Sequence, residues 1–142
     1  MPIDLPPAII GIASVIDGDT IEIHGNRIRL YGIDAPESRQ LCKDAQSQDY
    51  RCGQHSALYL SDVLSNRTVT CNPTGRDRYQ RIIARCFIGA VDIQARMVET
   101  GHAVAFVRYS RQYTPQENSA HTAHYGVWQG AFEMPWDWRK QH

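Results

Sequence analysis

Long apolar runs are missing from this sequence of 142 residues. A membrane-spanning helix needs about 18 or more consecutive apolar residues, and residues 9–16 are too short and are interrupted by Gly11 and Ser14. The first ten residues, MPIDLPPAII, lack the basic and apolar regions of a secretory signal peptide. We therefore expect no membrane association. We also expect either that the protein stays inside the cell or that the chain begins after a removed signal.

An excess of charge of either sign is also missing. The 15 Lys and Arg residues balance the 15 Asp and Glu residues, so the chain lacks the strong net charge that attracts polyanions over long distances. Lysine itself is scarce, and only Lys43 and Lys140 are present. Arginine offers a planar fork that matches phosphate oxygens, whereas lysine is a point charge. The bias toward arginine favours contacts with phosphate; a solvated surface is the alternative.

The four cysteines lack the CxxC spacing of zinc sites. An even number in a small domain indicates two disulfides, and three pairings are possible. We favour Cys42–Cys52, which would close the loop after Glu37, and Cys71–Cys86, which would join neighbouring strands. Disulfides indicate an oxidising compartment, so a secreted or periplasmic location is the favoured interpretation. Four reduced thiols in a cytoplasmic protein are the alternative.

Carboxylates gather at the ends of predicted strands within residues 15–37, VIDGDTIEIHGNRIRLYGIDAPE. Asp19 follows a glycine that can bend or bulge a strand, and Asp34 and Glu37 lie in a loop after the next strand. Arg29 lies on that strand, which follows a hairpin turn at His24-Gly25-Asn26. Oxygen ligands beside a rigidly held arginine suit a divalent cation and a phosphate. An ordinary turn and a solvated arginine are the alternative interpretation.

A second group of charged residues, GRDRYQRIIAR at 75–85, is a basic loop that leads into a strand. Its arginines can hold a phosphate while Tyr79 stacks on a base or sugar. Arg81 begins the strand, so its position is better defined than that of a loop tip. Asp77 is expected to pair with an arginine of its own loop. A solvated hairpin loop explains the same residues equally well.

Strands are predicted in two groups. Residues 9–33 alternate polar and apolar residues and form a three-strand meander, with a break at Asp17-Gly18-Asp19. Residues 67–71 and 81–88 form the second group, and Asn72-Pro73-Thr74-Gly75 is expected to be a turn. Asp17 either acts indirectly on a bound cation or only shapes the bend, and we favour a secondary role.

Helical spacing of apolar residues predicts three helices, at 54–64, 93–100 and 115–124. Asp92 and Gly101 suit the start and the end of the second. Because predicted strands precede predicted helices, we expect an α+β domain with a small antiparallel barrel.

Two segments have no clear period. Residues 38–53 are polar and are expected to form a loop, which at this length inside a domain is more often functional than idle. The end of the chain carries Trp128, Trp136 and Trp138. Such an aromatic segment is expected to pack back on the body of the protein.

Three strings in register, VIDGDT, IRLYGIDAPE and DRYQR, resemble the staphylococcal nuclease (thermonuclease) family. The likeness runs from about Ile12 to Trp128 and includes GHAVAFVRY and the late GVW. The resemblance implies a five-stranded antiparallel OB-fold β-barrel with three α-helices. It also implies calcium-dependent hydrolysis of DNA and RNA with little sequence specificity, which leaves 3′-phosphate ends. Residues 1–142 would form one such nuclease domain, with a core at about 9–128 and an aromatic tail at 129–142.

The resemblance assigns a calcium (Ca2+) site to residues that match the family motifs. Asp19 and Asp34 correspond to calcium ligands, and Ala35 corresponds to a residue that contributes its backbone carbonyl. The best-known member has threonine at that position. Because a carbonyl needs no particular side chain, we expect the difference to be tolerated.

Catalytic roles follow from the same match. Glu37 corresponds to the glutamate that acts as general base or orients the water. Arg29 and Arg81 correspond to the two arginines that grip the scissile phosphate, where charge builds in the transition state. Replacement of either arginine by lysine would keep the charge and lose the fork.

Substrate-binding roles are carried over less completely. Arg78 and Tyr79 fall where a lysine and a tyrosine contact the other phosphate, and Tyr109 matches one of two tyrosines near the nucleotide. Val107 stands at the second tyrosine position, so base stacking differs from that of the best-known member. The long loop with two cysteines is a further departure.

Two functions from different classes stay open at this point. One is a nuclease with DNA and RNA substrates, and the other is a non-catalytic OB-fold module that binds nucleic acid or protein. The complete set of residues named for calcium and catalysis favours the enzyme, because a binding module does not need it. His121 and His124 share a predicted helix face, which permits a zinc interpretation, but no third ligand is evident. Nothing in the sequence requires more than a monomer.

Overall fold

A curled mixed sheet forms the centre of the structure, a computed structural model that describes residues 5–142. The strand order is β1-β8-β9-β4-β3-β2, and β10 pairs with β9. Neighbours are antiparallel except β4 and β9, which run parallel with Ile28 opposite Ile82. The strands are β1 Ile9–Ile12, β2 Ser14–Asp17, β3 Thr20–Ile23, β4 Asn26–Leu30, β8 Thr68–Arg76, β9 Ile82–Ile88 and β10 Val91–Asp92.

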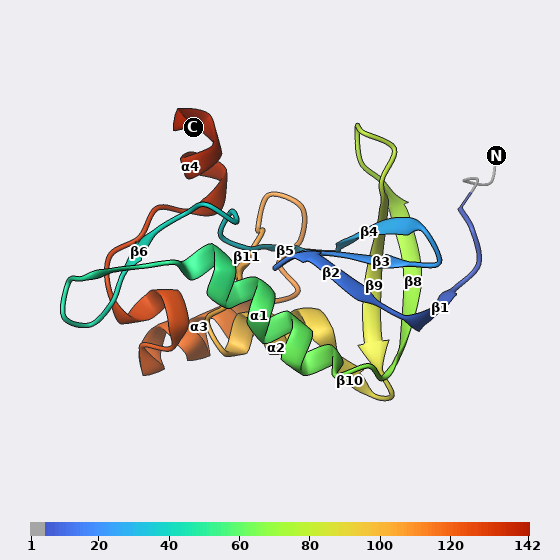
Figure 1. Ribbon diagram of the computed structural model, residues 1–142, viewed down its shortest axis with the longest axis horizontal. Coiled ribbons are helices and arrows are strands. Elements are labelled where there is room, and N and C mark those ends of the chain that lie inside the picture. Colours follow the sequence, from blue (N-terminus) through green and yellow to red (C-terminus); the bar gives the residue numbers. More distant parts are fainter. Residues whose placement is uncertain (1–4) are drawn as a thin grey trace.

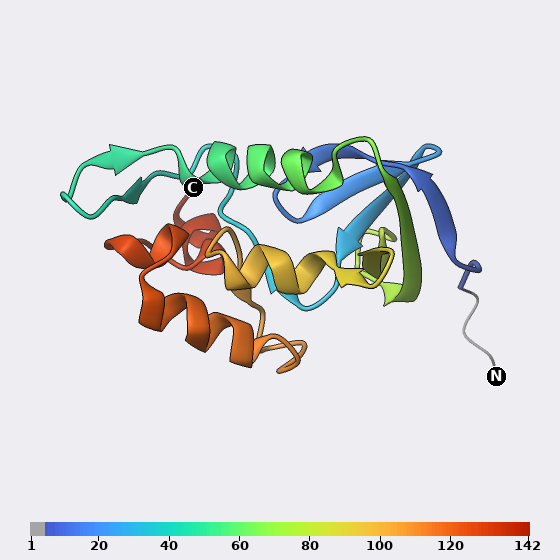
Figure 2. The ribbon, with the colours of Figure 1, turned by 90° about the horizontal axis from the view of Figure 1, so that it is seen from below.

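The two ends of this sheet belong to one segment of chain. β1 and β2 lie at opposite ends of the strand order, although only Ala13 separates them. The sheet therefore curls toward itself (Figures 1 and 2), an arrangement consistent with a small OB-fold barrel. The α+β class is confirmed. The prediction of five purely antiparallel strands is wrong in detail, because the first strand is split at Ala13 and β4 pairs in parallel with β9.

The three predicted helices are confirmed as α1 Cys52–Leu64, α2 Ile93–Glu99 and α3 Thr114–Ala123. The side chain of Asp92 accepts a hydrogen bond from the Ala95 amide at 2.9 Å and begins α2. A 3-10 helix, η1 Gly126–Gln129, and a fourth α-helix, α4 Pro135–Gln141, were not predicted. They are too short to show a periodic pattern in the sequence. Among the described residues, none of the helices has the length and apolar character required to cross a membrane.

The predicted break at Asp17-Gly18-Asp19 is present, but the chain reverses there instead of bending, and β2 pairs antiparallel with β3. A side chain at Gly18 would collide with Ser56 Oγ of α1, so the close approach of this turn to α1 requires glycine. The segment 72–75, predicted to be a turn, lies within β8. Pro73 is compatible with the strand because it lies beyond the β1 pairing, at a shift in register with β9.

The main core lies between the curled sheet and helices α1 and α2. The Cys71–Cys86 disulfide lies within it and joins directly opposed residues of β8 and β9. The other predicted disulfide, Cys42–Cys52, is also present. Fully buried members of this core include Ile21, Ile28, Leu30, Leu60, Val69, Ala84, Ile93 and Met97.

A smaller core holds the aromatic tail against the loop at 38–53. This loop contains a short hairpin of β6 Cys42–Lys43 and β7 Asp49–Tyr50, and the Cys42–Cys52 disulfide closes it. Trp128 and Trp136 pack against the disulfide cluster, so the prediction that the tail packs back is confirmed. In Figure 1, α4 stands beside β6 at the opposite end of the molecule from β1.

Candidate active site

Arg29 joins two of the predicted carboxylates. Its Nη2 lies 3.5 Å from Asp19 Oδ2 and 3.4 Å from Asp34 Oδ1. Asp19 lies in the turn before β3, Arg29 lies on β4, and Asp34 ends β5 Ile33–Asp34, which pairs with β11 Val104–Ala105. Arg29 Nη1 also donates hydrogen bonds to the carbonyls of residues 30 and 33, at 3.1 and 2.9 Å. The guanidinium is therefore held rigidly between the two acids.

Asp19 is held from two further directions. The Ala35 amide donates to Asp19 Oδ2 at 2.9 Å, and the Thr20 hydroxyl donates to Oδ1 at 3.1 Å. Burial alone would raise the pKa of Asp19, but the Arg29 guanidinium and these hydrogen bonds outweigh it and lower the pKa. Asp19 is therefore an ionised carboxylate with a fixed orientation.

The other two aspartates of the cluster have raised pKa values. Burial and the neighbouring Asp19 raise the pKa of Asp17 to about 7. Burial also raises the pKa of Asp34 to about 6, although the guanidinium of Arg139 and that of Arg29 favour its charged form. Asp17 accepts a hydrogen bond from the Asp19 amide at 3.2 Å. This bond lies within the turn, and the secondary role predicted for Asp17 stays a prediction.

Arg139, which the sequence analysis missed, connects Glu37 to this cluster. Its Nη1 and Nη2 donate to the two carboxylate oxygens of Asp34 at 3.0 and 2.8 Å, and Nη1 also donates to Glu37 Oε1 at 2.7 Å. The hydrogen bonds to Asp34 raise the pKa of Arg139 further above its ordinary value. Arg139 lies on α4, far along the chain from its partners. The one signal in the sequence was the aromatic tail that was expected to pack back.

Gln40 is a second residue that the sequence did not reveal. Its side chain is fully buried; Oε1 accepts from the Glu37 amide at 3.2 Å and Nε2 donates to the Glu133 carbonyl at 2.8 Å. Gln40 therefore ties the loop that carries Glu37 to the segment that leads into α4. A glutamine in a polar, aperiodic loop has no pattern that marks it as structural.

The donor set fits a hard divalent cation. Asp19 and Asp34 are buried and present carboxylate oxygens from two different segments, and such oxygens are preferred calcium ligands. The guanidinium of Arg139 shows that this position already stabilises positive charge. Within residues 5–142, no group of three or more His, Cys, Asp or Glu side chains is arranged to hold a metal ion. A cation held by Asp19, Asp34 and the Ala35 carbonyl would thus take its other ligands from water or substrate.

Arg81 lies apart from the carboxylate cluster, in the loop between β8 and β9. Its Nε donates to Asp77 Oδ2 at 2.6 Å, which confirms the expected pairing of Asp77 with an arginine. Asp77 Oδ1 accepts from the amides of Tyr79 and Arg81 at 2.8 and 2.9 Å. Burial would raise the pKa of Asp77, but these hydrogen bonds lower it. Asp77 therefore sets the shape of the basic loop, and β9 begins one residue after Arg81.

The basic loop borders a shallow groove of about 400 Å³. Tyr79 is 67% exposed, and the guanidinium of Arg78 lies 5.1 Å from its ring centre. Tyr109 is also exposed and packs edge-on against Phe106, with ring centres 4.8 Å apart. The structure thus places Tyr79 in the groove and Tyr109 outside the groove lining. The groove is lined by Glu22, Gly25, Asn26, Arg27, Arg76, Tyr79, Gln80, Arg81 and Ile82.

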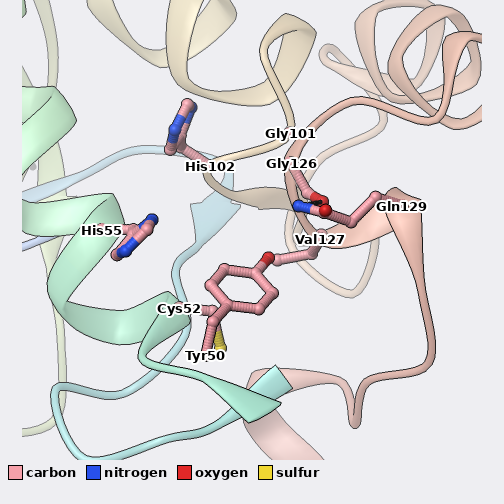
Figure 3. Close-up of a pocket in the computed structure, with 8 residues that line it drawn as sticks. All are labelled: Tyr50, Cys52, His55, Gly101, His102, Gly126, Val127 and Gln129. Atoms are coloured by element: carbon pink, nitrogen blue, oxygen red, sulfur yellow. Dashed lines mark hydrogen bonds between the residues drawn. The ribbon is translucent and has the colours of Figure 1, made fainter. Parts of the chain in front are cut away.

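A smaller cavity of about 80 Å³ contains none of the predicted site residues apart from the disulfide member Cys52. Figure 3 shows the Tyr50 ring reaching across it toward Val127 and Gln129, with His55 and His102 along another wall. His102 stacks on Tyr59 with ring centres 4.0 Å apart. Burial and nearby His55 lower the pKa of His102 to about 4. These contacts indicate a structural role for the cavity wall.

The histidine pair considered for zinc has structural contacts. His121 stacks on Trp128 with ring centres 4.3 Å apart. His124 follows the last residue of α3 with φ = +59°, a conformation common at helix ends. Both histidines therefore have roles at the end of α3 that explain their presence without a metal.

Comparison with known proteins agrees with this geometry. Residues 27–130 match the family described as staphylococcal nuclease homologue. The chain is 44% identical over 128 residues to succinoglycan biosynthesis protein ExoI of Rhizobium meliloti, which covers 84% of this chain and 64% of that protein. It is 34% identical over 116 residues to probable staphylococcal-like nuclease CAN4 of Oryza sativa, which covers 80% of this chain and 21% of that protein.

A third relative matches over most of both chains. An uncharacterized endonuclease of Escherichia coli is 32% identical over 136 residues, which covers 90% of this chain and 82% of that protein. The chain spans less than two thirds of the length of the first two relatives. The resemblance seen in the sequence motifs is confirmed, and the chain belongs to the staphylococcal nuclease homologue family.

Proposed function

We propose that this protein is a calcium-dependent endonuclease that hydrolyses phosphodiester bonds in DNA and RNA. The observation that carries the proposal is the shared guanidinium of Arg29, which lies within 3.5 Å of both Asp19 and Asp34. Glu37 belongs to the same cluster through Arg139. Relatives described as endonuclease and staphylococcal-like nuclease support the same reaction class. This set of acids beside an arginine suits the hydrolysis of a charged ester.

Calcium would be held by Asp19, Asp34 and the Ala35 carbonyl, and when bound it would neutralise charge that develops on a phosphate oxygen. Glu37 is the residue that would accept a proton from the attacking water or align it. The Glu37 side chain is 31% exposed, so water reaches its carboxylate. Its position near the acids therefore supports the role that the family motif implies.

The two arginines would act on the phosphate in different ways. Nη1 of Arg29 is fixed by two backbone carbonyls, which sets the orientation of the guanidinium, so Nε and Nη2 are the donors that would face charge on the phosphate. Arg81 uses Nε to bind Asp77, so its two Nη nitrogens are the donors that a phosphate would take. We propose that Arg29 contributes chiefly to transition-state stabilisation. Arg81 would donate a second pair of hydrogen bonds to the same phosphate from the groove beside the basic loop.

The finer features of the reaction are also proposals. Arginines and an exposed tyrosine in the groove suit sugar, phosphate and the flat face of a base, none of which specifies sequence. We therefore propose little sequence specificity, with 3′-phosphate ends as products. Arg78, Tyr79 and Tyr109 would contact the substrate. The two disulfides favour a secreted or periplasmic location, and we propose that residues 1–142 act as one monomeric nuclease domain.

Digestion of 5′-labelled single-stranded DNA tests the function. Purified protein is assayed with calcium, with calcium and excess EGTA, and with magnesium alone, beside Glu37→Ala and Arg81→Ala. Arg96 and Glu99 form an exposed ion pair with each other on α2. Arg96→Ala and Glu99→Ala are therefore the control variants. We expect calcium-dependent cleavage that is lost in the two site variants and kept in the controls. A mobility change of the products after phosphatase treatment would identify 3′-phosphate ends.

Absence of cleavage in every lane would contradict the nuclease, provided that circular dichroism shows folded protein and thiol titration shows intact disulfides. Retained binding of the same DNA would then support the OB-fold binding module. Equal cleavage in magnesium alone would contradict calcium dependence and leave the nuclease standing.

A further inference from the structure

A short helix at the end of the chain covers the proposed calcium site. Helix α4 Pro135–Gln141 begins after residue 130, where the match to the family ends. Its Arg139 donates to both carboxylate oxygens of Asp34 and to one oxygen of Glu37. The three bonds measure 3.0, 2.8 and 2.7 Å. These are the distances of charge-assisted hydrogen bonds. The guanidinium of Arg139 therefore places a positive charge of α4 in the site.

We propose that α4 is an autoinhibitory element: Arg139 occupies the calcium-binding carboxylates, and calcium enters only when α4 moves away. The inference rests on the proposed function, because it concerns the same site. The inference goes further because it assigns to Arg139 of the same chain the role of a competitor for calcium at Asp34.

Competition follows from the chemistry of Asp34. Calcium needs carboxylate oxygens as ligands, and Arg139 takes both oxygens of Asp34 as a bidentate fork. Arg139 and calcium therefore exclude each other at Asp34.

Glu37 is withdrawn from catalysis by the same contact. Its Oε1 accepts from Arg139 Nη1 at 2.7 Å. An oxygen that already accepts a charge-assisted hydrogen bond is not available to orient the attacking water. One side chain of α4 thus occupies both oxygens of Asp34 and one oxygen of Glu37.

The attachment of α4 is specific, yet small enough to be released. Trp136 stacks on Phe106 with ring centres 5.2 Å apart and an interplanar angle of 3°, and Gln40 holds the Glu133 carbonyl at 2.8 Å. The helix has seven residues, and helices this short are marginal without tertiary contacts. Release of α4 would leave the strands of the main sheet intact, because its partners lie in the smaller core and in the loops around Gln40 and Phe106.

The linked equilibria predict how calcium affinity responds. If the open state is a minor fraction of the free protein, the apparent dissociation constant is raised by the inverse of that fraction. Variants that open the site should therefore bind calcium more tightly. We expect about tenfold tighter binding in Arg139→Gln and about threefold tighter binding in Trp136→Ala, which keeps the charge but loosens the helix.

Isothermal titration calorimetry of residues 1–142 with calcium chloride, without any substrate, tests the inference. Lys140→Gln is the matched control, because it removes one positive charge from the same helix. Lys140 lies 3.9 Å from Asp137 of α4 and takes no part in the site. We expect its affinity to stay within about twofold of the original chain. An equal gain in Lys140→Gln and Arg139→Gln would overturn the inference, because net charge would then explain both.

Unchanged calcium affinity in both Arg139→Gln and Trp136→Ala would also overturn the autoinhibitory element, and the nuclease proposal would stand. Failure of all the folded proteins to bind calcium would instead refute the proposed function, and the inference with it. Hydrogen exchange supplies a second readout on the original chain. Saturating calcium should accelerate exchange in residues 135–142; unchanged exchange there, with calcium bound, would contradict release of α4.

Discussion

The carboxylate cluster and the basic loop are organised on different length scales. Asp34 receives hydrogen bonds from Arg29 on β4 and from Arg139 on α4, so segments from both ends of the chain build the cluster. In the basic loop, Asp77 binds Arg81 four residues away. The cluster is therefore a product of the whole fold, whereas the loop organises itself.

Burial and hydrogen bonding balance differently in the two regions. Burial and Asp19 raise the pKa of Asp17 to about 7 in the cluster. In the loop, the hydrogen bonds from Arg81 and from the loop amides overcome burial and lower the pKa of Asp77. The cluster is a buried, acidic site that gains from a cation, and the loop presents arginines and an exposed tyrosine beside the groove. Cation binding needs the first property, and contact with the substrate needs the second.

The largest effect is expected from Asp34→Asn. The variant keeps the shape of the side chain but removes the charge shared by Arg29, Arg139 and the proposed calcium ion. We expect kcat on single-stranded DNA to fall by about 1000-fold, the upper range for loss of one electrostatic group. Asp49→Asn, which breaks the exposed pair with Lys43, is the control and should stay near the original rate. A loss of less than tenfold would place the chemistry outside the cluster.

Lysine replacements compare the two arginines directly. We expect Arg29→Lys and Arg81→Lys each to lower kcat by about 100-fold, because lysine keeps the charge and loses the fork. Arg29→Lys should also lower the free energy of unfolding by about 1–3 kcal/mol, since its hydrogen bonds to two carbonyls are lost. Arg81→Lys should change it by less than about 1 kcal/mol because its pair is partly exposed. Steady-state kinetics and urea unfolding measure both, and near-normal turnover in Arg81→Lys would contradict bidentate contact.

Asp77→Asn tests whether the loop is organised from within. The carboxylate accepts three hydrogen bonds, from Arg81 Nε and from two loop amides. We expect KM for single-stranded DNA to rise by about tenfold and kcat to fall by less than in Arg81→Lys, because the fork of Arg81 is kept but is held less firmly. Asp62→Asn on α1 provides an exposed control. Unchanged KM and kcat would indicate that Asp77 does not organise the loop for the substrate.

The smallest effect is expected at Tyr79. Stacking of a base on an aromatic ring is worth about 1–3 kcal/mol, and the ring is already covered in part by the Arg78 guanidinium. We therefore expect Tyr79→Ala to raise KM by about fivefold, at the low end of that range. Tyr79→Phe keeps the ring and should match the original chain. Equal losses in both variants would mean that the hydroxyl, rather than the ring, contacts the substrate.

Sequence patterns predicted the local features of both regions well. The start of α2 at Asp92, the turn at residues 24–26, the Asp77–Arg81 pair and both disulfides are present as expected. The predicted turn at 72–75 failed because Pro and Gly can also lie in a strand that is unpaired on one side. A small barrel was predicted from the order of strands and helices as well as from the family resemblance, whereas the parallel β4–β9 pair and the fourth helix were not predicted.

The sequence by itself determined which residues could carry the chemistry, because Asp19, Arg29, Asp34 and Glu37 lie in motifs within one stretch of the chain, residues 15–37. Only the tertiary structure decided that Arg139 closes the site. Its bond to Asp34 spans 105 residues, and Gln40 reaches Glu133 across 93. Such contacts depend on how the tail packs against the disulfide-closed loop, through Trp136 and Phe106. Hydrophobic packing and charge pairing between distant segments leave no periodic mark in the sequence.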